Sequence, residues 1–148
     1  MPVLYKYTAD ERDEAINLFL STFAAEPFNY DWLRREDVLR YFIDLENTPG
    51  ALSFLYYDDR GLLLGLCFGT TNDYFRHKLY EIKEFAIRRD AQGGGNGGRM
   101  IAQVAKYLKK HEFEAITLST QRDIAAYEFY VKNGFVDLKQ SATLSKRL

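Results

Sequence analysis

Five glycines within six residues form the part of this sequence whose residue types point most directly to chemistry. They lie in Gly93-Gly94-Gly95-Asn96-Gly97-Gly98, after an apolar run that ends at Ile87 and before a helical pattern. Because glycine has no Cβ, the backbone N–H groups of such a turn can converge on a ligand. Those N–H groups, together with the positive end of the following helix, make an anion site. We expect this loop to hold the pyrophosphate of a cofactor.

Two phosphate-binding motifs fit this segment poorly. A Walker loop ends in Gly-Lys followed by Ser or Thr, whereas this chain continues as Gly98-Arg99-Met100. Residues 93–98 satisfy Gly-x-Gly-x-x-Gly formally, but the dinucleotide fingerprint begins directly after its strand and needs an acidic residue about 20 positions later. Here Arg88 to Gln92 intervene, and the next predicted strand ends in Ser119-Thr120. These departures argue against both interpretations.

A third pattern, Gln92-x-x-Gly95-x-Gly97, is accompanied by a second one downstream. Residues 126–135 read Ala-Tyr-Glu-Phe-Tyr-Val-Lys-Asn-Gly-Phe. The first pattern resembles the acetyl-CoA loop of the GNAT acetyltransferase superfamily. The second resembles that superfamily's other signature, Ala-x-x-Phe-Tyr-x-x-x-Gly-Phe, and the two stand in the right order.

A further similarity lies upstream, where Glu81-Ile82 and Ala86-Ile87 stand before Gln92 as in the histone-acetyltransferase branch. The resemblance covers most of the chain, and the N-terminal third, on the acceptor side, is its least diagnostic part. It implies one domain over residues 1–148 with the α/β (α+β) acyl-CoA N-acyltransferase fold of GNAT. That fold has a mixed, mostly antiparallel sheet flanked by helices, and the sheet splays in its middle, here between strands near 79–87 and 115–120.

The resemblance also implies acetyl-CoA as co-substrate. Its pantetheine arm would enter the splay as an extended amide chain and pair with backbone groups near Phe85 and Ile87. Asp123 stands where many relatives carry an asparagine that contacts the pantetheine, and it is also a candidate cap for a helix starting at Ile124. The cofactor-binding residues expected on this basis are Phe85, Ala86, Ile87, Gln92, Gly93, Gly94, Gly95, Asn96, Gly97, Gly98, Arg99, Asp123, Ala126 and Tyr130.

Three residues are candidates for the catalytic groups. In the family, the tyrosine at the position of Tyr130 lies near the thioester sulfur and assists departure of the thiolate, a fair leaving group with a thiol pKa of about 8.5. An attacking amine is protonated at neutral pH, so a carboxylate must accept its proton. Glu81 matches the family's glutamate by its distance from Gln92 and is favoured on that ground, whereas Glu84 lies nearer the splay and stays open as the alternative. The two glutamates would face opposite sides of a regular strand, unless a bulge intervenes.

The expected acceptor is the primary amine of a small cationic molecule, acetylated directly without an acyl-enzyme. Cys67 has no histidine in motif register and is expected in the core of the third strand. A protein or peptide N-acetyltransferase and a non-catalytic acyl-CoA-binding regulatory module are the alternatives. Aromatic and acidic side chains that could bind a cation, unless they belong to the core, are Phe28, Tyr30, Trp32, Tyr74, Phe75, Tyr80, Glu26, Asp31 and Asp73.

Hydrophobic periodicity predicts the elements that must position these groups. A strand over 3–7 is followed by Thr8-Ala9-Asp10-Glu11, which has capping-box spacing and starts a helix that ends near Ala25. Gly134 is the expected left-handed residue after the last helix. The remaining predictions are a helix over 32–45, strands over 51–57, 62–70 and 79–87, a helix over 97–111, a strand over 115–120, a helix over 124–133, and closing strands over 135–138 and 142–145.

Composition excludes several other classes. The chain has 148 residues, of which 47% are hydrophobic and 28% charged, and its net charge of −1 gives no general attraction to nucleic acid or an anionic membrane. Cys67 stands alone, and His77 and His111 are too far apart to suggest a metal site, so none is expected. No signal segment or apolar run of about 18 residues is found. A cytoplasmic protein is therefore expected, with a small-molecule amine as partner and a homodimer left open.

Overall fold

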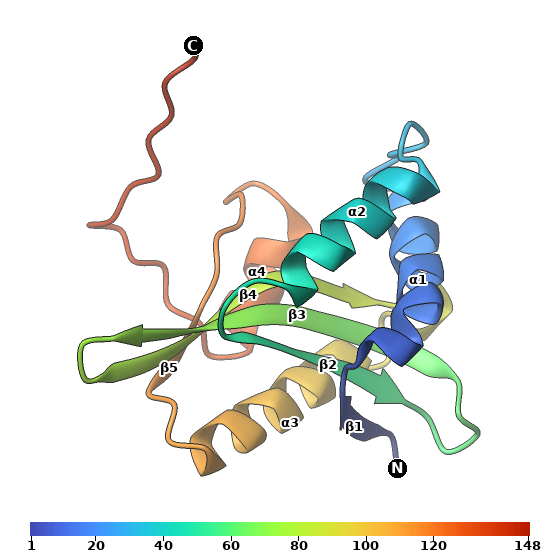
Figure 1. Ribbon diagram of the computed structural model, residues 1–148, viewed down its shortest axis with the longest axis horizontal. Helices are drawn as coiled ribbons and strands as arrows, with labels where there is room; N and C mark the ends of the chain where they lie inside the picture. Colours follow the sequence, from blue (N-terminus) through green and yellow to red (C-terminus); the bar gives the residue numbers. More distant parts are fainter. The chain divides into compact units, whose positions relative to one another are not determined.

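The computed structural model describes all residues 1–148, which form two separate units, residues 1–118 and residues 119–148 (Figure 1). The strands are β1 (Val3–Lys6), β2 (Ala51–Tyr57), β3 (Leu63–Tyr74), β4 (His77–Ile87) and β5 (Ala115–Thr117). The helices are α1 (Arg12–Ala24), α2 (Arg35–Glu46), α3 (Asn96–Lys110) and α4 (Ala125–Lys132), with 3-10 turns η1 (Ala9–Glu11) and η2 (Arg89–Ala91).

Unit 1–118 is built on one five-stranded sheet with the order β1-β2-β3-β4-β5. The first four strands are antiparallel neighbours, and β5 joins β4 in parallel. This confirms the mixed, mostly antiparallel sheet. Because β5 is three residues long, it pairs with β4 only at Leu79, Tyr80 and Glu81. Beyond Glu81 no strand lies on that side of β4, so the sheet parts where the sequence predicted.

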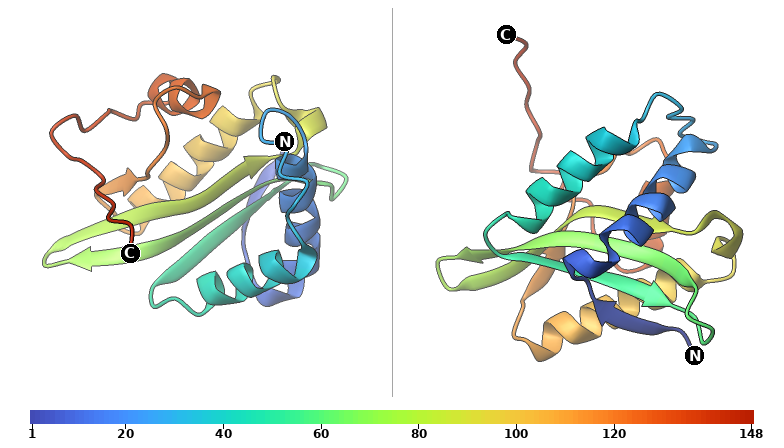
Figure 2. Two further views of the ribbon diagram at one scale, coloured as in Figure 1. Left: turned by 90° about the horizontal axis from the view of Figure 1, so that it is seen from above. Right: turned by 45° about the vertical axis from the view of Figure 1, so that its right-hand side comes forward.

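The two faces of this sheet carry different helices. α1 and α2 cover one face and α3 covers the other (Figure 2). Ile16, Phe42 and Leu66 are fully buried in the core on the α1–α2 side. Phe54 packs against Tyr107 of α3, with ring centroids 5.0 Å apart. Burial of apolar surface on both faces fixes the helices to the sheet. No helix in the structure combines the length and the apolar character needed to cross a bilayer.

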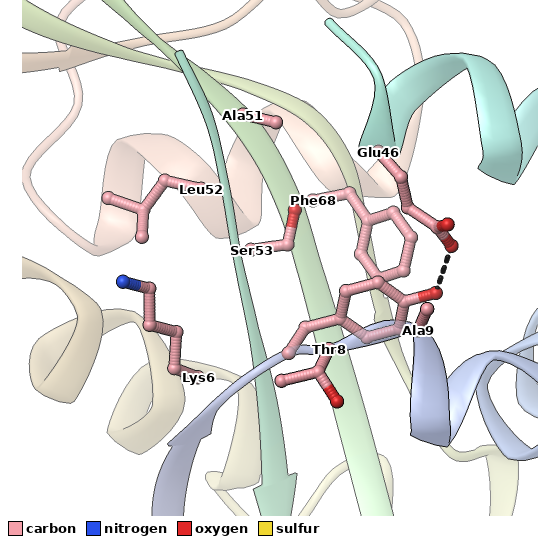
Figure 3. A pocket seen from close by; sticks show the side chains of 9 residues that line it. Lys6, Thr8, Ala9, Glu46, Ala51, Leu52, Ser53 and Phe68 are labelled. Carbon is pink, nitrogen blue, oxygen red and sulfur yellow. Dashed lines mark hydrogen bonds between the residues drawn. The ribbon is translucent and has the colours of Figure 1, made fainter. Parts of the chain in front are cut away.

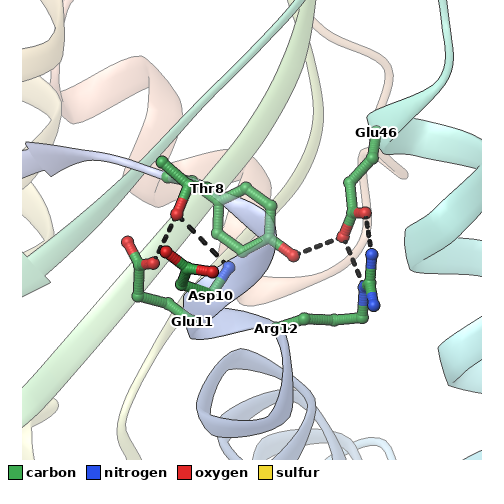
Figure 4. A network of polar contacts seen from close by, with 6 residues as sticks. Thr8, Asp10, Glu11, Arg12 and Glu46 are labelled. Carbon is green, nitrogen blue, oxygen red and sulfur yellow. Dashed lines mark hydrogen bonds and ion pairs between the residues drawn. The ribbon is translucent and has the colours of Figure 1, made fainter.

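A polar network joins the ends of β1, α1 and α2 (Figure 4). Thr8 caps η1 with its side chain, as the capping-box spacing predicted. Tyr7 donates its O–H to Glu46, and the Arg12 guanidinium donates two N–H groups to the same carboxylate. The hydrogen bonds from Arg12 lower the pKa of Glu46 below its ordinary value, so the carboxylate stays ionised. The network therefore fixes the start of α1 to the end of α2.

A β-bulge interrupts β4 in the middle of the sheet. Phe68 of β3 pairs with Glu84, whereas the next residue of β3, Gly69, pairs with Ile82. Lys83 is therefore the extra residue on β4. A bulge of this kind shifts the side-chain alternation of its strand and re-aims the side chains that follow.

The two closing strands predicted over 135–138 and 142–145 are absent, so that prediction is wrong. The only regular element in unit 119–148 is α4. A strand needs a hydrogen-bonded neighbour, and these residues form local turns instead. The N–H of Lys139 bonds to the carbonyl of Asp137, and the N–H of Ser141 bonds to the carbonyl of Leu138.

Gly69, opposite the bulge, has no room for a side chain. A Cβ there would lie 2.4 Å from Cζ of Tyr80 and 2.5 Å from the carbonyl oxygen of Glu81. The Tyr80 ring cannot easily move, because it is fully buried and its hydroxyl donates to the carbonyl of Leu52 at 2.6 Å. We expect Gly69→Ala to lower the free energy of unfolding by about 2 kcal/mol, as overpacking does, measured by urea denaturation.

Gly94→Ala is the matched control, because a Cβ at Gly94 would meet no atom within 4 Å. We expect it to change the free energy of unfolding by less than about 0.5 kcal/mol. An equal loss in both variants would contradict the packing argument.

Candidate functional site

The glycine loop leads from the end of β4, through η2, to the start of α3. Gly93 and Gly95 adopt φ angles of 81° and 84°. This left-handed conformation disfavours residues with a Cβ, so the sequence needs glycine at both positions. Gly95 then serves as the N-cap of α3, one residue earlier than the helix start at residue 97 implied.

Three side chains hold the loop in this shape. Gln92 and Asn96, both predicted to contact a cofactor, donate from their amide groups to backbone carbonyls of the same segment. Arg99 reaches back over the loop from the first turn of α3. The bonds are Gln92 Nε2 to Ile87 O at 2.9 Å, Asn96 Nδ2 to Ala91 O at 3.0 Å, and Arg99 to Gly94 O at 2.8 Å. These residues therefore shape the loop through its own backbone.

The loop has the properties of an anion site. The first N–H groups of α3 have no acceptor within the helix, and the helix dipole makes this end positive. The first turn carries no acidic side chain, and the Arg99 guanidinium lies beside it. Added Cβ atoms at Gly93 and Gly94 would meet nothing within 4 Å, so the chain itself leaves this space open. The residues present fit a diphosphate group.

The end of β4 leads directly into this loop. Phe85, Ala86 and Ile87 pair with β3 on one side. On the other side, the last residue of β4 that pairs with β5 is Glu81. A strand segment with a neighbour on one side only is the kind of edge to which an extended amide chain can add.

The bulge brings the two candidate glutamates to the same face of the sheet. Glu81 lies opposite Thr70, and Glu84 lies opposite Phe68. Thr70 and Phe68 are two residues apart on β3 and so share a face, and residues opposite each other also share a face. Phe68 belongs to the core under α1 and α2. The opposite orientation expected for a regular strand is therefore wrong here, because Lys83 is inserted between the two glutamates.

The surroundings of the two carboxylates differ. Glu81 forms an ion pair with Lys83 at 3.0 Å. Glu84 is half-buried, and its Oε2 accepts a hydrogen bond from the hydroxyl of Tyr41 on α2 at 3.0 Å. Burial raises the pKa of Glu84 above its ordinary value, and the hydrogen bond from Tyr41 opposes that rise. A carboxylate of raised pKa, half-buried beside an open strand, has the properties of a general base.

Tyr41 was not among the residues singled out from the sequence. It directly precedes Phe42, which is fully buried in the core. A helical side chain next to the core position lies at the margin of the helix's apolar face, where it can reach the sheet. The place of Tyr41 beside a core residue of α2 could have marked it as a residue facing the sheet. Nothing in the sequence indicates that its partner is Glu84.

The aromatic set predicted for the acceptor does not form one pocket. Phe28, Tyr30 and Trp32 pack together in the loop between α1 and α2, with centroid distances of 5.8 Å and 5.3 Å. Tyr74 and Phe75 are exposed at the tip of the β3–β4 hairpin, away from that loop (Figure 1). Tyr80 is fully buried on the α3 face, next to Phe54. The prediction is wrong for Tyr80, because its place on the strand turns it towards α3.

The second signature motif forms a helix end in unit 119–148. Gly134 is left-handed, with φ of 93°, as predicted. The N–H of Phe135 bonds to the carbonyl of Tyr130, and the N–H of Gly134 bonds to the carbonyl of Val131. This is the Schellman arrangement, and the contact of the Tyr130 and Phe135 rings, 5.3 Å apart, accompanies it. The motif thus has a structural reason for its tyrosine, glycine and phenylalanine.

The helix-cap prediction for Asp123 is wrong, and the core prediction for Cys67 is confirmed. α4 begins at Ala125 with Ile124 as N-cap and no side-chain cap, so the capping role considered for Asp123 is wrong. Cys67 lies buried in β3, as predicted. Burial raises the pKa of its thiol to about 12, so it stays protonated and is no nucleophile at neutral pH.

Two cavities lie away from the glutamates and the glycine loop. One, of about 220 Å³, is lined by residues of β1, β2 and the end of α2, among them Lys6, Ser53 and Glu46 (Figure 3). The other, of about 330 Å³, is lined by residues that include Lys78, Tyr107 and Phe113. Neither is lined by Glu81, Glu84 or any loop glycine. The residues suited to acetyl transfer therefore lie on the open side of β4 and not in either of these two cavities.

Comparisons with known proteins agree with this geometry. The aminoglycoside acetyltransferase from an uncultured soil metagenomic sample, solved with sisomicin, is 16% identical, with a TM-score of 0.74 over 99% of this chain and 96% of its own. An aminoglycoside 6'-N-acetyltransferase from Acinetobacter baumannii is 10% identical, with a TM-score of 0.73 over 100% and 99%. A transcriptional regulator from Bacillus halodurans is 15% identical, with a TM-score of 0.76 over 100% of both chains.

These likenesses establish the fold, and a search of curated sequences returned no match. The acetyltransferase (GNAT) family matches residues 13–135, which include β4, the glycine loop and the α4 signature. This match spans most of the chain and agrees with the parted sheet and the left-handed glycines. The chain therefore belongs to the GNAT family of acetyltransferases.

Proposed function

We propose that this acetyltransferase uses acetyl-CoA to acetylate directly the primary amine of a small cationic molecule. The observation that carries the proposal is the position of Glu84, a half-buried carboxylate on the strand that leads into the anion-binding loop. The whole chain, residues 1–148, acts as one acetyltransferase domain. The structural neighbours described as aminoglycoside acetyltransferases support a small amine as acceptor.

Different segments of the chain bind different parts of acetyl-CoA. The amides of residues 93–98 and the N-terminus of α3 bind the pyrophosphate, with Arg99 beside them. The side of β4 beyond Glu81 binds the pantetheine arm in the manner of an added strand. Acetyl-CoA supplies the acetyl group as a thioester. The loop and the strand thereby hold the reacting end of the cofactor near Glu84.

The chemistry requires two proton movements. Glu84 accepts the proton of the amine, directly or through a water molecule, as the nitrogen forms its bond to the acetyl carbon. The carbon–sulfur bond breaks with its electron pair on sulfur, and Tyr130 donates a hydrogen bond or proton to the departing thiolate. The role of Tyr130 rests on its place in the signature motif. Glu81 is the less suitable base, because it is ion-paired with Lys83.

The acceptor binds at the exposed members of a set of contacting aromatic rings that starts at Tyr41, beside Glu84, and is linked through Phe19, whose ring belongs to the core. Tyr41 is hydrogen-bonded to Glu84, and its ring centroid lies 6.5 Å from that of Phe19. The ring centroids of Phe19 and Phe23 lie 4.5 Å apart. The set continues through Tyr30, stacked 6.3 Å from Phe23, to Trp32, which is 67% exposed. Exposed aromatic faces attract organic cations, and the acidic residues Glu26 and Asp31 belong to the same loop.

A ligand-binding regulatory module is the second candidate, because one neighbour with this fold is described as a transcriptional regulator. Such a protein would bind acetyl-CoA but release no CoA with any amine. Tyr130→Phe would then leave all measurable properties unchanged.

Removal of the base tests the central assignment. We expect Glu84→Gln to lower kcat roughly 100-fold or more, because the amide cannot accept the amine proton. KM for acetyl-CoA should stay within about twofold, since Glu84 holds no part of the cofactor. Steady-state release of CoA thiol measures both.

Glu81→Gln is the matched control on the same face of the same strand. We expect it to lower kcat less than about fivefold. The reverse ranking of the two variants would assign the base to Glu81.

The loop should respond to the cofactor. We expect saturating acetyl-CoA to slow amide hydrogen exchange across residues 92–98, because the loop N–H groups become hydrogen-bonded to the pyrophosphate. Acetyl-pantetheine, which lacks the pyrophosphate, should protect these amides much less. Unchanged exchange with acetyl-CoA would rule out the loop as the pyrophosphate site.

Tyr130→Phe separates leaving-group assistance from packing. The phenylalanine keeps the ring contact with Phe135, and a urea denaturation of the variant reports any change in stability separately from kcat. We expect kcat to fall about tenfold or more through loss of the donor. The effect should be largest for acyl donors whose leaving thiol has a high pKa. An unchanged kcat would restrict Tyr130 to its structural role at the end of α4.

A further inference from the structure

Tyr41 makes a side-chain hydrogen bond to Glu84, and it comes from a different element of the fold. Its hydroxyl donates to Glu84 Oε2 at 3.0 Å, from α2 to the bulge of β4. A carboxylate has two oxygens and can accept on both. Tyr41 takes one acceptor site of Oε2, so Oε1 keeps its full capacity to accept a proton from an amine.

The Tyr41 ring is held in place by its neighbours. It makes edge contacts with Phe19 of α1 and with Phe42, at ring-centroid distances of 6.5 Å and 6.2 Å. Phe42 is fully buried, while Tyr41 is 37% exposed. The ring therefore sits on a rigid base with its hydroxyl at the rim, which is the arrangement needed to orient another side chain.

The phenol remains a donor over the whole working range of pH. Burial raises the pKa of Tyr41 above its ordinary value, and the nearby charge of Glu84 raises it further. Tyr41 is thus never ionised near neutrality. Its O–H stabilises the ionised form of Glu84 against the opposing effect of burial.

The other charged groups on the elements around Glu84 are exposed or paired with one another. On β3, the residues opposite this part of β4 are uncharged, and α1 contributes the Phe19 ring. Asp44, one helical turn beyond Tyr41, is exposed to solvent. On β4 Glu81 pairs with Lys83, and on α2 Asp37 pairs with Arg34 and Arg40.

We propose that Tyr41 is the positioning residue of Glu84, orienting the carboxylate so that Oε1 faces the acceptor amine and keeping it ionised at neutral pH. This inference rests on the proposed function, in which Glu84 is the base. The competing explanation is that the hydrogen bond merely fastens α2 to the sheet.

The test measures Glu84 directly in the protein without ligand. Carboxyl-carbon NMR of glutamate-labelled protein is recorded against pH, and Glu84→Gln identifies the Glu84 signal. In Tyr41→Phe, which keeps the ring contacts, we expect the midpoint of that signal to rise by about one pH unit, because a donor to the carboxylate is lost.

Tyr57→Phe is the matched control. Tyr57 also donates to a glutamate, Glu14, at 3.1 Å, and so ties β2 to α1. That variant loses an equivalent Tyr–Glu hydrogen bond, but one that joins β2 to α1 and does not involve β4. We expect it to leave the Glu84 midpoint and kcat unchanged.

Kinetics supplies the second readout. In Tyr41→Phe the acid limb of the kcat/KM profile should move to higher pH by the same amount as the Glu84 midpoint, and kcat at neutral pH should fall about tenfold. KM for acetyl-CoA should not change. An unshifted Glu84 midpoint, with only the thermal stability lowered, would overturn the inference. If no amine is acetylated at all, the proposed function fails, while the NMR midpoint still decides whether Tyr41 controls Glu84.

Discussion

The candidate site depends on how β4 is paired between Glu81 and Glu84. On one side β5 stops after three residues, so β4 continues with a strand beside it only on the β3 side. On that side Lys83 is inserted as a bulge. The first feature provides an edge for an extended ligand, and the second brings Glu84 to the same face as Glu81. Both features are local departures from a regular sheet, and each places one part of the proposed chemistry.

The elements around β4 keep this arrangement in place. Gly69 gives the buried Tyr80 ring room opposite the bulge, and the Arg12–Glu46 pair fixes α1 to α2 on the other face. α2 in turn brings Tyr41 to Glu84. A half-buried carboxylate is costly unless it has a hydrogen-bond partner, so the packing of a helix and the ionisation of a strand residue are coupled. The functional face is therefore a consequence of tertiary packing as much as of the strand itself.

Much of the fold could be predicted because its signals are local. The glycines at 93 and 95 adopt the positive φ that their residue type favours, and Gly134 ends α4 as the helix pattern indicated. Hydrophobic periodicity located every helix and the strands through β5 to within a few residues. The mixed sheet and its parting followed from the family resemblance carried by the same glycine and aromatic motifs.

The rest depends on long-range pairing that residue types do not encode. The bulge at Lys83 brings Glu81 and Glu84 to one face, although three residues of regular strand would place them on opposite faces. No local sequence signal marks this bulge. Residue type alone leaves Tyr80 open between pocket and core, because aromatic residues occur in both, and its register on β4 places it in the core. The segments predicted as strands after α4 form no ladder with any strand, and composition alone does not supply such a partner. Tyr41 was overlooked because its partner lies 43 positions away.

A crystal structure of the protein with acetyl-CoA tests the account most directly. The account predicts the pyrophosphate on the amides of residues 93–98, the pantetheine arm along β4 beyond Glu81, and the thioester carbon on the face that carries Glu84. A cofactor bound in either of the two cavities lined by Lys6, or a pantetheine arm that avoids β4, would contradict it.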